Sequence, residues 1–197
     1  NIINVAFIGN PNCGKTTLFN AYTGAGLKVA NWPGVTIEKK EGDFEFDGQK
    51  MKLVDLPGIY SLTSYTMEER LSREYILQND VDVIIDVADA SSLERNLYLT
   101  VQLIEIGKPV ILALNMMDEV RSHGDSIDLA GLEKGLGVPV VAAGIPTLME
   151  AEEGADLVVT PRALDSVIAH GSALLAAAIN RALQPKLSVA QLCWLVG

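Results

Sequence analysis

Short apolar runs alternate, over the first 140 residues or so, with segments whose apolar positions recur at helical spacing. The runs are β-branched or leucine-rich and end at Gly, Pro, Asp or Asn, which predicts buried strands at 4–9, 51–54, 81–87, 110–114 and 138–142. Helices are predicted at 16–22, 67–78, 92–106 and 129–136. Because alternating strands and helices form a mostly parallel sheet covered on both faces, the predicted fold class is α/β.

Two stretches depart from this alternation. Asp47-Gly48 separates two alternating stretches within 44–52, which is a hairpin signal and predicts one antiparallel edge strand. Apolar positions recur at helical spacing over 161–183, with Thr160 as N-cap and Pro161 in the first turn. We therefore expect a core domain over residues 1–141 and a C-terminal strand-loop-helix segment over 142–197 that packs on it.

Composition narrows the classes of protein. No apolar run in the 197 residues approaches the roughly 18 that span a bilayer. Cys13 and Cys193 lack the spacing of a zinc site and are too few for a disulfide framework. The formal net charge of −10 argues against nucleic acid as a partner, because nucleic acid rewards clustered Lys and Arg. A local pocket for a small anion remains compatible with that charge.

Residues 9–16 read Gly-Asn-Pro-Asn-Cys-Gly-Lys-Thr, a full match to the phosphate-binding loop (P-loop) pattern between a predicted strand and a predicted helix. The backbone N–H groups of such a loop surround phosphates, and the helix N-terminus favours their negative charge. Lys15 is expected to reach the β- and γ-phosphates, and the Thr16 hydroxyl to ligate Mg²⁺. Nucleotide contacts are expected from Gly9, Asn10, Asn12, Cys13, Gly14, Lys15, Thr16 and Thr17.

Two later motifs fit a nucleoside triphosphate. Asp55-Leu56-Pro57-Gly58 follows the predicted strand 51–54, where the aspartate can hold Mg²⁺ and the Gly58 N–H can sense the γ-phosphate. Thr36 lies between this motif and the P-loop, and could reach Mg²⁺ and the γ-phosphate when a triphosphate is bound. We therefore expect Mg²⁺ at Thr16, Thr36 and Asp55, and catalytic roles for Lys15, Thr36 and Gly58.

Asn115-Met116-Met117-Asp118 ends the predicted strand 110–114. In guanine-nucleotide proteins the pattern Asn-Lys-x-Asp reads the base, because the aspartate accepts from the ring N–H and the exocyclic amine of guanine. Met116 replaces the lysine here, and its aliphatic body can still cover one face of the base. An adenine would leave the Asp118 carboxylate unpaired, which disfavours it. The motif predicts GTP and GDP as ligands.

Together these motifs resemble the cytosolic G domain of the ferrous iron transporter B (FeoB) family. The resemblance covers residues 4–141 and includes Asn-Trp-Pro-Gly-Val-Thr at 31–36, residues 55–62 and the guanine motif without lysine. It implies a P-loop GTPase fold and a switch on the cytoplasmic side of the bacterial inner membrane, whose Fe²⁺ permease domain is absent from this chain. It also implies mobile loops at 28–40 and 58–70, and a K⁺ ion held by Asn12.

The resemblance ends near Val141. Where the family has a serine-containing loop against the base, this chain has Ala142-Ala143-Gly144, so we expect Ala143 and Gly144 to contact the base through backbone groups. Residues 142–190 instead resemble the C-terminal part of the spore germination protease, with Glu150 at the position of an aspartate associated with catalysis. Protease activity is not expected, because the half that carries its partner is missing.

The expected catalytic equipment is sparse. Ile59 follows Gly58 where a glutamine could orient water, so GTP hydrolysis is expected to be slow and stimulated by K⁺. Glu68 and Glu69 lie nearby, but surface charge is their expected role. A non-catalytic GTP/GDP-sensing module stays open as an alternative, as does a soluble P-loop GTPase unrelated to transport. Homo-oligomerisation also stays open, and Trp32 is expected to pack differently in each nucleotide state.

Overall fold

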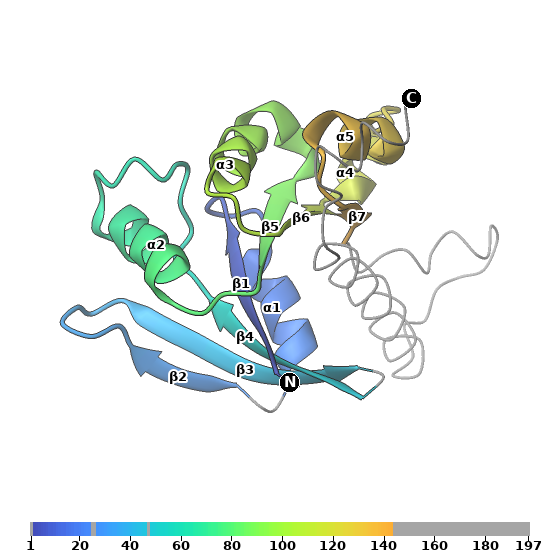
Figure 1. Ribbon diagram of the computed structural model, residues 1–197. Coiled ribbons are helices and arrows are strands. Elements are labelled where there is room, and N and C mark those ends of the chain that lie inside the picture. Colours follow the sequence, from blue (N-terminus) through green and yellow to red (C-terminus); the bar gives the residue numbers. More distant parts are fainter. Residues whose placement is uncertain (1, 25–26, 47, 144–197) are drawn as a thin grey trace, which may run out of the picture.

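A seven-stranded sheet runs through the residues that the computed structural model describes, which are 2–24, 27–46 and 48–143 (Figure 1). Its strands are β1 (Ile3–Gly9), β2 (Lys28–Asn31), β3 (Glu38–Phe46), β4 (Gln49–Asp55), β5 (Val83–Asp89), β6 (Val110–Asn115) and β7 (Val140–Ala142). The helices are α1 (Lys15–Thr23), α2 (Met67–Gln78), α3 (Leu93–Glu105), α4 (Met117–Ser122) and α5 (Leu129–Leu136), with a 3₁₀ turn η2 (Ala90–Ser92) before α3. The predicted α/β class is confirmed.

The strand order is β2-β3-β4-β1-β5-β6-β7. β1 pairs in parallel with β4 and β5, and β5, β6 and β7 continue the parallel pairing. β3 is antiparallel to both β2 and β4. The hairpin at Asp47-Gly48 was predicted correctly, but the prediction of an antiparallel strand at the edge was wrong, since β2 lies outside β3.

The strand β2 was not predicted, because all four of its residues are exposed and it has no apolar pattern. It forms a hairpin with β3, and the turn between them is 32–37. The loop expected at 28–40 is therefore shorter than the sequence indicated. Likewise, α2 begins at Met67, so the second loop is 56–66 rather than 58–70.

Helices cover both faces of the sheet, and each face has its own apolar cluster (Figure 1). Successive strand residues point to opposite faces, so Phe7 of β1 packs with Phe19 of α1, and Ile8 joins the cluster that contains Leu99 of α3. Ile76 places α2 in that second cluster. α2 and α3 therefore lie on one face and α1 on the other.

The parallel strands bring the ends of β1, β4 and β6 to the same edge of the sheet. The P-loop, the loop 56–66 and the Asn115–Asp118 motif follow these three strands, as ligand-binding segments do in open α/β sheets. Within the described ranges, every helix is too short or too polar to cross a membrane. The helix expected at 161–183, Gly144 and Glu150 all lie outside those ranges.

Candidate nucleotide site

The P-loop turns sharply between β1 and α1. Asn12 has φ 65° and Gly14 has φ 82°, both in the left-handed region, and α1 begins immediately afterwards at Lys15. A Cβ atom at Gly14 would collide with the Asn115 side-chain amide, so both the conformation and the space require glycine. The loop and the start of α1 surround a cavity of about 500 Å³, lined by Asn10, Pro11, Asn12, Gly14, Lys15, Thr16, Thr17 and Gly58.

Lys15, Thr16 and Asp55 converge beside this cavity. The Lys15 ammonium donates to Oδ1 of Asp55, and both side chains are buried. The Thr16 hydroxyl lies 3.5 Å from Oδ2 of the same carboxylate. The structure therefore brings the P-loop and the end of β4 together. A hydroxyl and a carboxylate are hard oxygen donors, which suits Mg²⁺.

The loop 56–66 leaves β4 and lies against the P-loop. The Ile59 N–H donates to the Gly9 carbonyl at 3.0 Å. A Cβ atom at Gly58 would lie 3.3 Å from Cα of Pro11, so the Gly58 backbone borders the cavity closely. The Ile59 side chain is only 3% exposed and belongs to the apolar cluster of α2 and α3. Position 59 therefore provides no polar group beside the cavity.

Glu69 organises the loop before α2, and the prediction that it is a surface charge was wrong. Its carboxylate accepts from the backbone N–H groups of Tyr65 and Thr66 and from the hydroxyls of Ser61 and Thr63. Burial, the largest influence, raises its pKa, but these hydrogen bonds outweigh it and hold the pKa below its usual value. The sequence contained a signal for this role, since Thr66-x-x-Glu69 is a capping box.

The guanine motif meets the P-loop through Asn115, whose Nδ2 donates to the Cys13 carbonyl at 3.0 Å. Met116 follows in the left-handed conformation, with φ 60°, and α4 begins at the next residue. Asp118 is exposed in the first turn of α4 and is not among the residues that line the cavity. Ala143 lies just after β7, where its N–H donates to the Leu114 carbonyl at 2.8 Å.

The three remaining predicted residues, Thr36, Asn10 and Cys13, lie in three different environments. Thr36 is exposed on the turn 32–37 and does not line the cavity, so the structure does not bring it together with Thr16 and Asp55. Asn10 is 2% exposed, and neither of its side-chain amide atoms has a hydrogen-bond partner. Burial raises the pKa of the Cys13 thiol to about 11, which keeps it protonated at neutral pH.

Gln102 of α3 was not predicted to contact the loop 56–66. Its side-chain oxygen accepts from the Leu62 N–H at 2.7 Å, which ties the loop 56–66 to a helix 40 positions later in the chain. A glutamine on an amphipathic helix has no distinguishing pattern, so only the packing of α3 beside the loop reveals this contact.

A family model described as Ferrous iron transport protein B matches residues 3–160. The chain belongs to this family. It is 52% identical over 143 residues to the Fe(2+) transporter FeoB of Salmonella typhimurium, a match that covers 71% of this chain and 18% of the transporter. It is 45% identical over 171 residues to a Fe(2+) transport protein A/FeoB fusion protein of Porphyromonas gingivalis, covering 81% and 20%. The chain thus spans about a fifth of the length of these FeoB relatives.

Solved FeoB structures have the same fold. The cytosolic domain of T. maritima FeoB aligns with a TM-score of 0.78 at 40% identity, over 94% of this chain and 66% of that one. The G domain of the same protein aligns with a TM-score of 0.69 at 42% identity, over 87% and 99%. A GDP-bound mutant of S. thermophilus FeoB aligns with a TM-score of 0.69 at 50% identity, over 72% and 56%. The chain therefore has the P-loop GTPase fold of a FeoB G domain.

These comparisons also correct two expectations. The FeoB family match continues to residue 160, beyond the end expected near Val141. The resemblance of 142–190 to the spore germination protease finds no support in them, and the T. maritima cytosolic domain aligns over 94% of the chain. Membership of the FeoB family also sets aside the alternative of a GTPase unrelated to transport.

Proposed function

We propose that this chain is a GTP- and GDP-binding switch that hydrolyses GTP slowly for a ferrous iron transporter. The observation that carries the proposal is the convergence of Lys15, Thr16 and Asp55 beside a cavity at the N-terminus of α1. Backbone N–H groups at that terminus favour phosphate, and the Lys15 ammonium adds the positive charge that a triphosphate requires. The GDP-bound relative from S. thermophilus supports the same assignment.

Mg²⁺ would be held by Thr16 and Asp55, with Thr36 as a further ligand when GTP is bound. When bound, the ion supplies charge neutralisation for the phosphates. Asn12 is exposed at the cavity, and its side-chain oxygen suits a K⁺ ion beside the phosphates. Lys15 changes partner in this scheme, because its ammonium leaves Asp55 for phosphate oxygens.

Hydrolysis transfers the γ-phosphoryl group to water and releases GDP. Lys15 would stabilise charge on the phosphate oxygens, and the Gly58 N–H would contact the γ-phosphate. The buried Ile59 side chain has no group that can orient the attacking water. The intrinsic rate is therefore expected to be low and to rise when K⁺ adds positive charge.

Asp118 would select guanine, with Met116 against one face of the base. Asn115 would act through the P-loop, since its amide is bonded to the Cys13 carbonyl. Ala143 and Gly144 would approach the base through backbone groups. Asp118 would contribute through hydrogen bonds that adenine cannot make. Removing the Asp118 carboxylate should therefore affect base selection more than phosphate binding.

Nucleotide competition tests this proposal. A fluorescent GDP analogue is displaced by GTP or by ATP from the wild type, from Asp118→Asn and from Asp125→Asn, a matched control at an exposed aspartate of the following loop. We expect GTP to displace the analogue at least about 100-fold better than ATP from the wild type and the control, and the preference to fall at least about 10-fold in Asp118→Asn. Equal displacement by GTP and ATP from the wild type would overturn the guanine assignment.

One observation favours a second candidate, a GTP/GDP-sensing module without useful turnover. The Ile59 side chain is apolar and buried, and it is not among the described residues that line the cavity. Single-turnover hydrolysis in K⁺ and in Na⁺ separates the two candidates, with Asn12→Ala as the variant that removes the K⁺ ligand. Turnover that K⁺ stimulates in the wild type and not in Asn12→Ala supports the switch enzyme. No turnover in either salt supports the sensing module.

The switch would act within a longer protein at the cytoplasmic side of the membrane, since the matched relatives are transporters about five times the length of the aligned segment. Residues 1–141 would form the nucleotide-binding core. The segment 142–197 would pack on the face of the sheet that α1 covers. The apolar cluster on that face extends to Ile111 and Ala113 of β6 and Val141 of β7. A homo-oligomer of the full protein also stays a proposal.

A further inference from the structure

The turn 32–37 is anchored in the core by Trp32. This side chain is only 6% exposed and belongs to the apolar cluster of α2 and α3. Within the turn, the Trp32 N–H donates to the Ile37 carbonyl at 2.9 Å, and the Val35 N–H donates to the Trp32 carbonyl at 3.2 Å. Val35 and Ile37 also pack partly against the cluster. Hydrogen bonds and apolar packing therefore tie the turn to its tryptophan.

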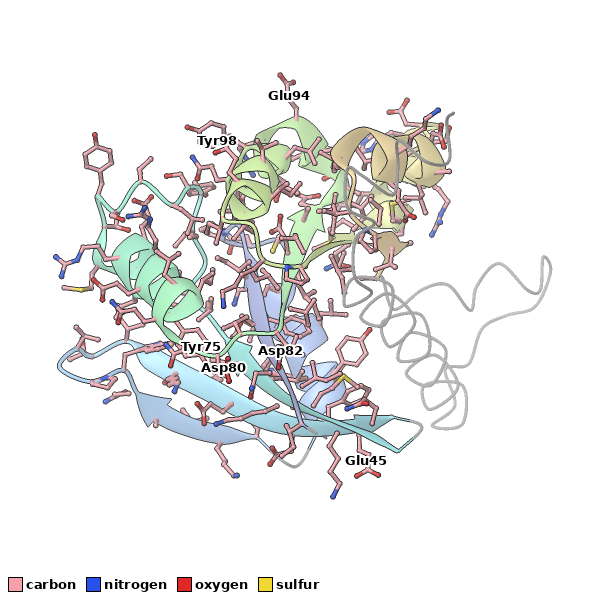
Figure 2. All side chains as sticks on the ribbon, in the orientation of Figure 1. Glu45, Tyr75, Asp80, Asp82, Glu94 and Tyr98 are labelled. Carbon is pink, nitrogen blue, oxygen red and sulfur yellow. The ribbon has the colours of Figure 1, made fainter. Side chains whose placement is uncertain are left out.

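Trp32 contacts α2 through Tyr75. The two rings meet edge to face, with centroids 5.3 Å apart and planes at 79°. Figure 2 shows Tyr75 on the side of α2 toward β3, and the Lys39 ammonium of β3 lies 5.1 Å from the Trp32 ring and 5.6 Å from the Tyr75 ring. Glu41 holds Lys39 in place at 2.6 Å. The Tyr75 ring is thus a direct contact between α2 and the turn, beside the apolar cluster that Ile76 of α2 shares with Trp32.

This link bears on Thr36, the expected Mg²⁺ ligand of the same turn. Thr36 is exposed and lies outside the residues that line the cavity. The hydrogen bond from the Trp32 N–H to the Ile37 carbonyl closes the turn, so a movement of Thr36 toward the cavity that keeps this bond also displaces Trp32. In such a movement Trp32 leaves the Tyr75 ring, or α2 moves with it.

The Trp32 and Tyr75 rings can also separate at a modest cost in free energy. The indole Nε1 is buried without a hydrogen-bond partner, so the side chain is held by apolar packing, by the Tyr75 ring and by the Lys39 ammonium, and not by a hydrogen bond of its own. On leaving α2, the indole N–H gains a hydrogen bond to water, which offsets part of the lost packing. A ring contact of this kind can therefore set an equilibrium between two positions of the turn.

We propose that Tyr75 is a positioning residue for the hydrolysis reaction, acting through Trp32 to set how readily Thr36 reaches the Mg²⁺-bound triphosphate. This role rests on the proposed function. GDP has no γ-phosphate for Thr36 to approach, so the Tyr75 ring disfavours GTP binding relative to GDP binding. Removing the ring shifts the turn toward the position that GTP selects.

Trp32 fluorescence and nucleotide affinities test the role together. The chain has two tryptophans, so Trp194→Phe leaves Trp32 as the single reporter. In that background Tyr75→Ala removes the ring, Tyr75→Leu keeps apolar volume in case the alanine variant folds poorly, and Tyr75→Phe keeps the ring. Tyr98→Ala is the matched control, since Tyr98 is 59% exposed on α3. Affinities for GDP and for a non-hydrolysable GTP analogue are measured with Mg²⁺.

We expect Trp32 emission to move to longer wavelength in Tyr75→Ala and Tyr75→Leu before any nucleotide is added. The affinity for the GTP analogue should rise about 5-fold relative to that for GDP in these two variants, and remain unchanged in Tyr75→Phe and Tyr98→Ala. Adding Thr36→Ala to Tyr75→Ala should abolish the gain, because the gain requires the Thr36 hydroxyl.

Several outcomes would overturn the positioning role. These are unchanged Trp32 emission in both ring-removing variants, an equal change in affinity for GDP and for the analogue, or a gain that survives Thr36→Ala. Failure of the wild type to bind either nucleotide would instead overturn the proposed function, and the positioning role with it, even if the emission shift occurred. The emission measured without nucleotide therefore distinguishes the two failures.

Discussion

The side-chain amide of Asn115 donates a hydrogen bond to the main-chain carbonyl of Cys13, 102 positions earlier in the chain, at 3.0 Å. The guanine motif at the end of β6 therefore supports the phosphate loop directly. Gly14 makes room for this contact, because a side chain there would collide with the amide. The segments proposed to bind the base and the phosphates are thereby joined through one residue.

Asn115→Ala should weaken nucleotide binding indirectly, because Asn115 supports the P-loop through the Cys13 carbonyl. The substitution leaves the Cys13 carbonyl without its donor at a partly buried site, a loss of about 1–3 kcal/mol. We expect the affinity for GDP to fall about 10-fold and the midpoint of thermal unfolding to decrease. Titration with a fluorescent GDP analogue measures the first effect and calorimetry the second.

Asn20→Ala is the control for Asn115→Ala, since Asn20 is an exposed asparagine on α1. It should alter neither quantity by more than the error of measurement. Wild-type affinity in Asn115→Ala would contradict the supporting role of this amide.

Glu69→Ala should loosen the loop before α2. The variant removes the carboxylate that accepts from the Tyr65 and Thr66 N–H groups, and the free energy of unfolding should fall by about 1–2 kcal/mol in urea titrations. Hydrogen exchange of the Tyr65 amide should accelerate. Glu68→Ala changes an exposed neighbour and should do neither.

The effect of Glu69 also has a predicted pH dependence. Because its pKa in the folded protein is held below the usual value, its stabilising contribution is present above the unfolded pKa and is lost as the pH falls through the folded pKa. The difference in stability between wild type and Glu69→Ala should therefore shrink in acid. A constant difference from neutral pH into acid would exclude the charged carboxylate as its cause.

Asp86 of β5 should make the protein less stable as the pH rises. Burial raises its pKa to about 7, although the Thr100 hydroxyl, which donates at 2.6 Å, lowers it. The unfolded chain releases this proton at a lower pH, so between the two pKa values the folded protein binds more protons and loses stability with each rise in pH. Asp86→Asn should not show this loss of stability, because the asparagine amide does not release a proton in this pH range.

The stability of the wild type relative to Asp86→Asn should fall by roughly 2–3 kcal/mol between pH 5 and pH 8. Urea unfolding at several pH values measures it, and Asp80→Asn, at an exposed aspartate, should follow the wild type. If the wild type and Asp86→Asn lose stability in parallel, Asp86 does not titrate in this range.

The proposed packing of 142–197 predicts the behaviour of a shortened chain. Ending the chain at residue 143 would remove the cover expected over Ile111, Ala113 and Val141, so the chain should unfold at a lower temperature and bind a hydrophobic dye. Equal thermal stability of the shortened chain and the 197-residue chain would show that 144–197 does not stabilise the core.

The sequence predicted most elements of the described fold because their signals are local. The helices 67–78 and 129–136 match α2 and α5, and each buried strand was expected within a few residues of its observed bounds. The P-loop was recognisable for the same reason, since its glycines, lysine and threonine are contiguous and lie between a strand and a helix. β2 was missed because exposed strands leave no apolar pattern.

The sequence by itself determined the class of fold, the P-loop and the motifs that follow β4 and β6, because each depends on neighbouring residues and on strand-end geometry common to parallel sheets. Only the tertiary structure decided which distant groups meet. The bond from Asn115 to Cys13, the burial of Glu69 and the ring contact of Trp32 with Tyr75 join residues from separate elements. Burial and hydrogen bonding depend on that packing, which the spacing along the chain does not specify.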